Sequence, residues 1–287
     1  MSRLPRFVAL LAAALILTPA LGRAGHRPPT TYVRFQAGNT IAYGVLAEGQ
    51  IRQIDGAPFG PWKPTGKTYK LSEVRLLVPT QPTKILAVAG NYKSHLSSKP
   101  APKRPELFLK PPSCLIAAGE PIVLPRGSSK VDHEGEMVIV IGKRARKVPP
   151  EKALEHVLGV TCGNDVSARD WQTGDVQWWR AKGCDTFGPC GPMVASGINY
   201  DDLGLVLRVN GQVRQQQRTK DMIFGVAALV SFVSQHVTLE PGDLIFTGTP
   251  GTTTALKPGD LVEVELEGVG VLANPVTAEL DEALPQK

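Results

Sequence analysis

Apolar and polar residues alternate in short runs along much of the chain, and glycine, asparagine and proline separate these runs. The pattern is clearest near the start, where three such runs are divided by turns at Gly38-Asn39 and Glu48-Gly49: Tyr32–Phe35, Ile41–Leu46 and Ile51–Ile54. Short alternating runs joined by such turns are typical of β-hairpins. We therefore predict a small β-rich unit over residues 25–75 and a larger domain over residues 76–287.

The larger domain has longer apolar runs. Ile85–Ala89 and Met137–Ile141 are unbroken, rich in β-branched residues and followed by glycine, which predicts buried strands. Asn210-Gly211 predicts a tight hairpin. Helical patterns are few: one over residues 151–158, closed by Gly159, and a long amphipathic one over residues 219–237. The balance predicts a mixed α+β fold dominated by strands.

The first residues have a different character. Arg3 and Arg6 precede an apolar core over residues 7–17, and small residues follow up to Ala24. This is the pattern of a secretory signal peptide, which we predict over residues 1–24. The apolar core is short for a membrane span, although an uncleaved anchor is the alternative. No later stretch predicts a transmembrane helix, so we expect an exported, periplasmic protein with no stable membrane partner after cleavage.

Charge and cysteine spacing exclude several classes of protein. The net charge is +6, but three of these charges are arginines of the predicted leader, and no basic stripe is interleaved with aromatic residues. We therefore expect no nucleic-acid partner. The four cysteines (Cys114, Cys162, Cys184 and Cys190) show no zinc-binding spacing. Cys184 and Cys190 are the one pair close in sequence, yet a domain of this size needs no disulfide, and we favour free or buried thiols.

Carboxylates gather where predicted strands begin or end. Asp132, Glu134 and Glu136 alternate into the strand predicted at Met137–Ile141, so we expect all three to point to one face. Asp165 ends another short strand. A solvated strand end facing water is the simpler interpretation. The alternative is a metal site. Glu134, Glu136 and Asp165 have no cysteine or histidine at ligand spacing, so as ligands they favour Mg²⁺ or Mn²⁺. About three coordination positions would be left for water and substrate.

Motifs for phosphate, dinucleotide, serine-hydrolase and zinc-protease sites are absent. Instead, six segments in order resemble the fumarylacetoacetate hydrolase family. They are Gly90-Asn-Tyr-Lys-Ser-His95, Phe108-Leu-Lys-Pro111, Asp132-His-Glu-Gly-Glu136, Asn164-Asp-Val-Ser-Ala-Arg-Asp170, Lys182-Gly-Cys-Asp-Thr-Phe-Gly-Pro189 and Pro241-Gly-Asp-Leu-Ile-Phe-Thr-Gly-Thr-Pro250. Any one of them is weak, but six in order from about Ile85 to the end make a specific match.

The resemblance implies a central β-roll, a homodimer and a site for a small 2-oxo acid. It implies that Glu134, Glu136 and Asp165 bind the divalent metal, while Asp132 is a supporting acid. By the same resemblance Arg169 and Gln172 contact the substrate carboxylate, Thr249 lines the pocket, Lys182 is the catalytic lysine and His95 is the catalytic histidine of a lid. Without it, Lys182 would be taken for a surface lysine and His95 for a loop histidine.

One position departs from the family pattern. Members with a histidine–glutamate pair on the lid carry the glutamate three residues after the histidine, where this chain has Ser98. A serine cannot stabilise an imidazolium as a carboxylate does; Glu106 is a substitute if the lid folds back.

Our hypothesis is an Mg²⁺- or Mn²⁺-dependent enzyme that acts on a 2-oxo acid through a metal-bound enolate, by C–C bond hydrolysis, decarboxylation or keto–enol isomerisation. Ser98 weighs slightly against fast hydrolysis. An exported protein that binds 2-oxo acids without turnover is the alternative, and a structural protein with a cation staple is a third.

Overall fold

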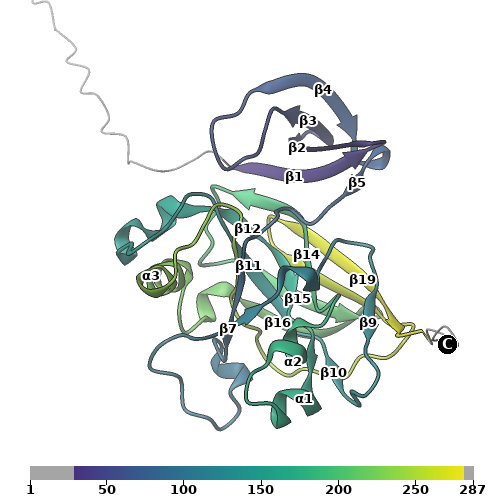
Figure 1. The fold of residues 1–287 in the computed structure, drawn as a ribbon, viewed down its shortest axis with the longest axis vertical. Helices are drawn as coiled ribbons and strands as arrows, with labels where there is room; N and C mark the ends of the chain where they lie inside the picture. Colours follow the sequence, from purple (N-terminus) through teal and green to yellow (C-terminus); the bar gives the residue numbers. More distant parts are fainter. Residues whose placement is uncertain (1–28, 281–287) are drawn as a thin grey trace, which may run out of the picture.

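Two large β-sheets form the framework of the molecule (Figure 1). The structure is a computed structural model that describes residues 29–280, and the predicted signal peptide over residues 1–24 lies outside the described residues. Within residues 29–280, no helix is both long enough and apolar enough to cross a bilayer. The predicted strand-dominated α+β fold is confirmed.

The larger sheet has ten strands in a continuous path. Their order is β4 (Pro64–Lys70), β3 (Gln50–Ile54), β2 (Thr40–Ala47), β1 (Thr30–Ala37), β14 (Gly188–Ser196), β12 (Val157–Asn164), β11 (Gly135–Ile141), β17 (Leu244–Phe246), β6 (Ile85–Ala89) and β7 (Glu106–Lys110). β5 (Arg75–Leu76) pairs with β1, and β8 (Leu115–Ile116) pairs with β14. Neighbours on the main path are antiparallel except β17 and β6, which run parallel.

The second sheet packs against the centre of the first. Its order is β16 (Gln212–Arg218), β15 (Gly204–Val209), β18 (Leu261–Leu266), β19 (Gly270–Ala278) and β9 (Ile122–Leu124). β11 is buried on both faces: Met137, Ile139 and Ile141 join the core shared with the second sheet, and Val138 and Val140 join a second core. Because both faces of β11 are buried, its sequence is continuously apolar rather than alternating.

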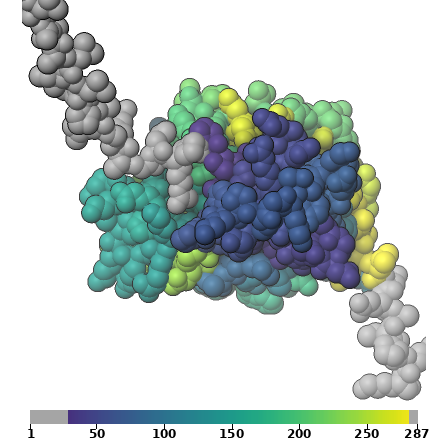
Figure 2. All heavy atoms as spheres, turned by 90° about the horizontal axis from the view of Figure 1, so that it is seen from above, coloured from purple at the N-terminus to yellow at the C-terminus, as the bar shows by residue number. Residues whose placement is uncertain are grey.

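The predicted N-terminal strands are present, and they extend the larger sheet. Thr30, Thr31 and Tyr32 of β1 pair with Ser196, Ala195 and Val194 of β14. β1 to β4 form a layer over the rest of the molecule, seen from above in purple and blue (Figure 2). The predicted boundary between residues 75 and 76 falls within β5.

Both predicted helices differ from the structure. Residues 150–156 form a 3₁₀ helix, η4 (Pro150–His156), because Val157 and Leu158 belong to β12, where Val157 pairs with Ile141 of β11. The long helix starts late: η5 (Thr219–Asp221) is a single 3₁₀ turn, and α3 (Val226–His236) begins after Gly225. Between them the side chain of Asn91 binds both backbone groups of Phe224, which keeps that segment out of the helix.

The remaining helices are short. α1 (Arg169–Gly174) and α2 (Trp179–Gly183) follow the two-stranded pairing of β10 (Val131–Asp132) with β13 (Ser167–Ala168), and η1 (Leu71–Glu73), η2 (Lys93–His95) and η3 (Pro112–Cys114) are single 3₁₀ turns. All four cysteines are free, three of them buried, as predicted.

Candidate active site

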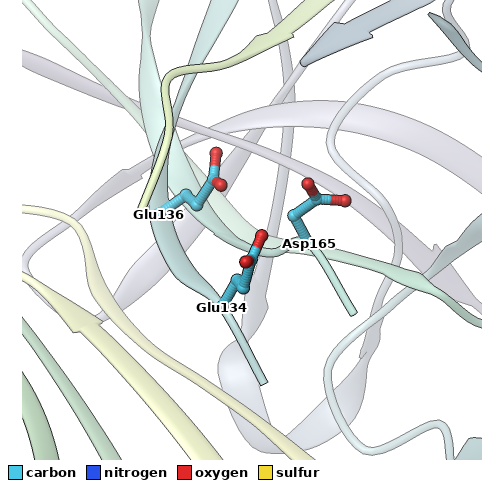
Figure 3. Close-up of side chains that lie close together, drawn as sticks. All are labelled: Glu134, Glu136 and Asp165. Atoms are coloured by element: carbon cyan, nitrogen blue, oxygen red, sulfur yellow. The ribbon is translucent and has the colours of Figure 1, made fainter. Parts of the chain in front are cut away.

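Three carboxylates meet where two neighbouring strands begin and end. Gly135, the first residue of β11, pairs with Asn164, the last residue of β12, and Asp165 follows directly. The backbone N–H of Asp165 donates to the Glu134 carbonyl over 2.9 Å, and that of Glu134 donates to the Asn164 side chain over 2.8 Å. These bonds turn Glu134, Glu136 and Asp165 toward one another (Figure 3), and one ligand oxygen from each lies within 4.8 Å of the others.

Asp132 does not share their strand face. β10 ends at Asp132 and β11 begins at Gly135. Our prediction of one continuous strand through Asp132, Glu134 and Glu136 is therefore wrong. The chain leaves extended pairing at His133 and Glu134, and Asp132 turns instead to Arg169 Nε over 2.9 Å and Thr253 Oγ1 over 2.8 Å. Asp132 therefore supports the site through these two residues, away from the carboxylate cluster.

Lys182 is buried beside Glu134 and Asp165. Its ammonium group donates to Glu134 Oε2 over 2.6 Å and to Asp165 Oδ2 over 2.8 Å. Burial lowers the pKa of this lysine, but the charges of Asp165 and Glu134 outweigh burial and raise its pKa above the ordinary value. Lys182 thus donates hydrogen bonds to both carboxylates from a buried position, and its interpretation as a surface lysine is wrong.

The two glutamates have opposite electrostatic environments. Burial raises the pKa of Glu134, but Lys182 and Arg169 outweigh burial and bring its pKa to about 2. Burial together with the charges of Asp165 and Glu134 raises the pKa of Glu136 well above its ordinary value. Within residues 29–280, Glu136 forms no ion pair, and the Gly248 N–H donates to its Oε2 over 2.8 Å.

This imbalance fits a divalent cation. A buried carboxylate without a positive partner is costly, and a cation held among the three oxygens would supply the charge that Glu136 lacks. The donor set consists of carboxylate oxygens alone, which suits a hard ion. Glu134, Glu136 and Asp165 are therefore the residues that could hold a metal.

Arg169 and Gln172 lie side by side next to the carboxylate cluster. Arg169 Nη2 donates to Glu134 Oε1 over 2.6 Å, and Nη1 donates to Gln172 Oε1 over 2.8 Å. Because the carbonyl oxygen of Gln172 accepts from Arg169, its amide N–H groups remain for another acceptor. Both residues come from α1, which starts directly after β13.

His95 approaches the cluster from η2. Its Nδ1 lies 2.7 Å from the carbonyl oxygen of Gly251, and its Nε2 lies 3.7 Å from Glu134 Oε1. A carbonyl oxygen only accepts, so Nδ1 carries a proton, and in the neutral ring Nε2 is the basic nitrogen. The position three residues on, Ser98, is exposed, and in the described part of the chain it is Gly251 rather than a carboxylate that binds Nδ1.

A pocket with an empty volume of about 310 Å³ brings together six of the eight predicted site residues, whereas Glu136 and Asp165 do not line it. It is lined by His95, Glu134, Arg169, Gln172, Lys182 and Thr249, and its other walls are Val88, Ala89, Gly90, Phe108 and Trp178. The rings of Phe108 and Trp178 meet edge to face at 5.4 Å and form the apolar side. The ammonium group of Lys182 lies 5.2 Å from the centre of the Phe108 ring, so the pocket combines charged and apolar groups, as a site for a small acid does.

Sequence reasoning missed several residues that hold this site. The buried ammonium group of Lys110 donates to Asp165 Oδ1 over 2.6 Å, to the Phe187 carbonyl over 3.1 Å and to the Lys182 carbonyl. Thr253 Oγ1 bridges Arg169 and Asp132. Lys110 stands in the Phe108–Pro111 motif, so a lysine inside an apolar strand was the available sign; nothing in the sequence marked Thr253 or the Gly251 carbonyl.

The strand-rich fold and the buried carboxylate cluster at a small pocket define the class to which the protein belongs. The family model for the fumarylacetoacetate (FAA) hydrolase C-terminal domain matches residues 84–277, and the Rv2993c-like N-terminal model matches residues 31–79. The chain belongs to the fumarylacetoacetate hydrolase family, as the resemblance predicted.

Three relatives show how far the similarity extends. Protein Rv2993c of Mycobacterium tuberculosis is 44% identical over 81% of this chain and 90% of its own length. Oxaloacetate tautomerase FAHD2A, mitochondrial, of Bos taurus is 42% identical over 71% of this chain and 70% of its own length. The crystal structure of 2-hydroxyhepta-2,4-diene-1,7-dioate isomerase from Mycobacterium marinum superposes with a TM-score of 0.83 at 40% identity, covering 88% of this chain and all of that chain.

Proposed function

We propose that the protein is a divalent-metal-dependent isomerase that interconverts the keto and enol forms of a small 2-oxo acid. The observation that carries this proposal is the state of His95, whose Nδ1 is bound to the Gly251 carbonyl while Nε2 faces the pocket. Keto–enol exchange moves one proton between carbon 3 and the 2-oxo oxygen, and one basic nitrogen suffices for it. A tautomerase and an isomerase among the relatives agree with this choice.

Hydrolysis of a C–C bond makes a heavier demand. It needs a water molecule activated as a nucleophile and a proton for the departing carbon, work that a histidine paired with a carboxylate does well. The Gly251 carbonyl orients the imidazole but carries no charge that would stabilise an imidazolium through Nδ1. This comparison favours isomerisation over hydrolysis.

Other residues of the pocket bind the substrate, stabilise the charge that develops on it and exclude water. Gln172 donates its free amide N–H groups to the substrate carboxylate, and Arg169 holds the amide in that orientation. His95 Nε2 removes the proton from carbon 3 and then delivers it to the 2-oxo oxygen, which completes the enol. Lys182 directs its third N–H, unused by Glu134 and Asp165, at that oxygen while it carries negative charge. Phe108 and Trp178 limit the access of water. A bound Mg²⁺ or Mn²⁺ ion, held by Glu134, Glu136 and Asp165, would act as a Lewis acid toward the substrate oxygens.

The test is a tautomerase assay on the purified full chain. Enol-oxaloacetate, which absorbs in the ultraviolet, is added with Mg²⁺, with Mn²⁺ or with EDTA, and its conversion to the keto form is followed. We expect acceleration that requires a metal and falls by about 10²–10⁴-fold in His95→Gln, the usual contribution of a general base.

Two results would oppose the proposal. Loss of absorbance accompanied by equal release of CO₂ would identify a decarboxylase. No acceleration of oxaloacetate or of a 2-hydroxy-dienoic diacid with either ion would remove the isomerase proposal.

A further inference from the structure

We propose that Ser94 and Gln217 are positioning residues that hold His95 in the pocket and take over the orienting role of a lid carboxylate at position 98. The proposal rests on the proposed function of His95 as the proton carrier. Position 98 is an exposed serine, so a different group must fix the imidazole. The contacts around η2 identify that group.

Residues 94 and 95 bind Gly251 from both sides. His95 Nδ1–H donates to the Gly251 carbonyl over 2.7 Å, and the Gly251 N–H donates to Ser94 Oγ over 3.0 Å. These two bonds join η2 to the loop after β17 through a single peptide residue. The imidazole therefore cannot turn about χ2 without losing the Gly251 carbonyl.

Gln217 completes the arrangement from the second sheet. The Ser94 hydroxyl donates its one proton to Gln217 Oε1 over 2.6 Å and so presents its lone pairs to the Gly251 N–H. Gln217 is half-buried on β16, whereas Ser94 is exposed. The hydroxyl thus joins a strand, the η2 turn and the Gly251 loop, which are separate in sequence.

The N-terminal side of η2 is fixed independently. Asn91, fully buried, donates to the carbonyls of Phe224 and Thr247 and accepts from the Phe224 N–H. Tyr92 forms a bridge with Met222. The chain is therefore anchored up to Tyr92. Beyond that anchor the His95 N–H donates to the Tyr92 carbonyl over 3.0 Å, and the Ser94–Gln217–Gly251 contacts fix the direction of the imidazole.

The variants that test this are Ser94→Ala and Gln217→Leu, with matched controls at two exposed neighbours, Ser98→Ala and Gln216→Leu. Because the lost bonds are neutral and partly exposed, we expect kcat for enol conversion to fall about three- to tenfold in each test variant. KM should stay constant, since the substrate carboxylate binds elsewhere. The double variant should be no slower than either single one, because both substitutions break the same hydrogen-bonded chain.

A second measurement does not depend on turnover. Nitrogen NMR of ¹⁵N-histidine-labelled protein, with His95→Gln for assignment, should show Nδ1 protonated in the wild type and a mixture of both ring forms in Ser94→Ala. Hydrogen exchange at the Gly251 amide should be faster in that variant. The two controls should match the wild type.

The outcomes separate the two proposals. If the wild type turns over no 2-oxo acid but its ring protonation and Gly251 exchange change as expected in Ser94→Ala, the positioning role stands and the isomerase proposal fails. If both variants leave ring protonation and exchange as in the wild type, the positioning role is overturned, whatever happens to kcat. Equal losses in test and control variants would also overturn it.

Discussion

Replacement of Lys110 by methionine should strongly destabilise the protein. The Lys110 side chain is fully buried, and its ammonium group binds Asp165 Oδ1 and the carbonyls of Lys182 and Phe187. Methionine fills similar space but leaves Asp165 with one cation fewer and removes a donor from the carbonyls of Lys182 and Phe187, of which that of Phe187 keeps the Val166 N–H at 3.2 Å. Loss of one partner of a buried ion pair costs about 3–5 kcal/mol.

The assay is equilibrium unfolding in urea, followed by circular dichroism, for Lys110→Met and for the exposed control Lys67→Met. At about 2–4 °C per kcal/mol for a chain of this size, the same loss lowers Tm by roughly 6–20 °C. Lys67→Met should change the free energy of unfolding by less than about 0.5 kcal/mol.

A double variant tests whether the loss of stability in Lys110→Met is electrostatic. In Lys110→Met with Asp165→Asn the negative charge is removed as well, so the double variant should be more stable than the sum of the two single losses predicts. If Lys110→Met costs less than about 1 kcal/mol, or the double variant shows simple additivity, our account of this buried pair is wrong.

Three further predictions concern the lid, the metal and the thiols. Ser98→Glu should not accelerate enol conversion, because the Nδ1 of His95 is already bound by Gly251; a clear gain in kcat would show that this bond is weak. Mg²⁺ at about 100 times its dissociation constant should stabilise the wild type by about 2.7 kcal/mol and Glu136→Gln much less; equal thermal shifts in both proteins would place the ion elsewhere. Cys184 alone should react with a thiol reagent in the folded protein, because Cys114, Cys162 and Cys190 are fully buried and burial raises the pKa of Cys162 to about 12; several fast-reacting thiols before denaturation would contradict this packing.

Local pattern predicted the strands of this fold well and its helices poorly. The strand at Met137–Ile141 and the turn at Asn210-Gly211 each appear where expected. Both depend on the residue types within the segment itself, an unbroken apolar run in one case and an Asn-Gly pair in the other. The helix expected from residue 219 starts at Val226, because Asn91, 133 residues from Phe224, binds the intervening backbone. Such a partner is invisible to periodicity.

The same distinction applies to the site. The carboxylates and Lys182 could be proposed because side-chain type and order are written in the sequence and match a family pattern. The group that holds His95 is a backbone carbonyl, which every residue possesses, so no residue type at Gly251 indicates it. Lys110 falls between these cases: its motif was recognised, but its partners depend on how β7 meets β12 and α2.

The pairing of β1 with β14 has a consequence for solubility. Without residues 30–70, Val194, Ala195 and Ser196 at the end of β14 would lose their partners in β1 and present free backbone groups on a mostly buried strand, a template for association between chains. With them, the terminal strand is β4, which carries Pro64, Lys67 and Lys70 and is mostly exposed. Proline and lysine are residues that discourage further strand addition. The N-terminal strands thus replace an edge that favours pairing with another chain by an edge that disfavours it.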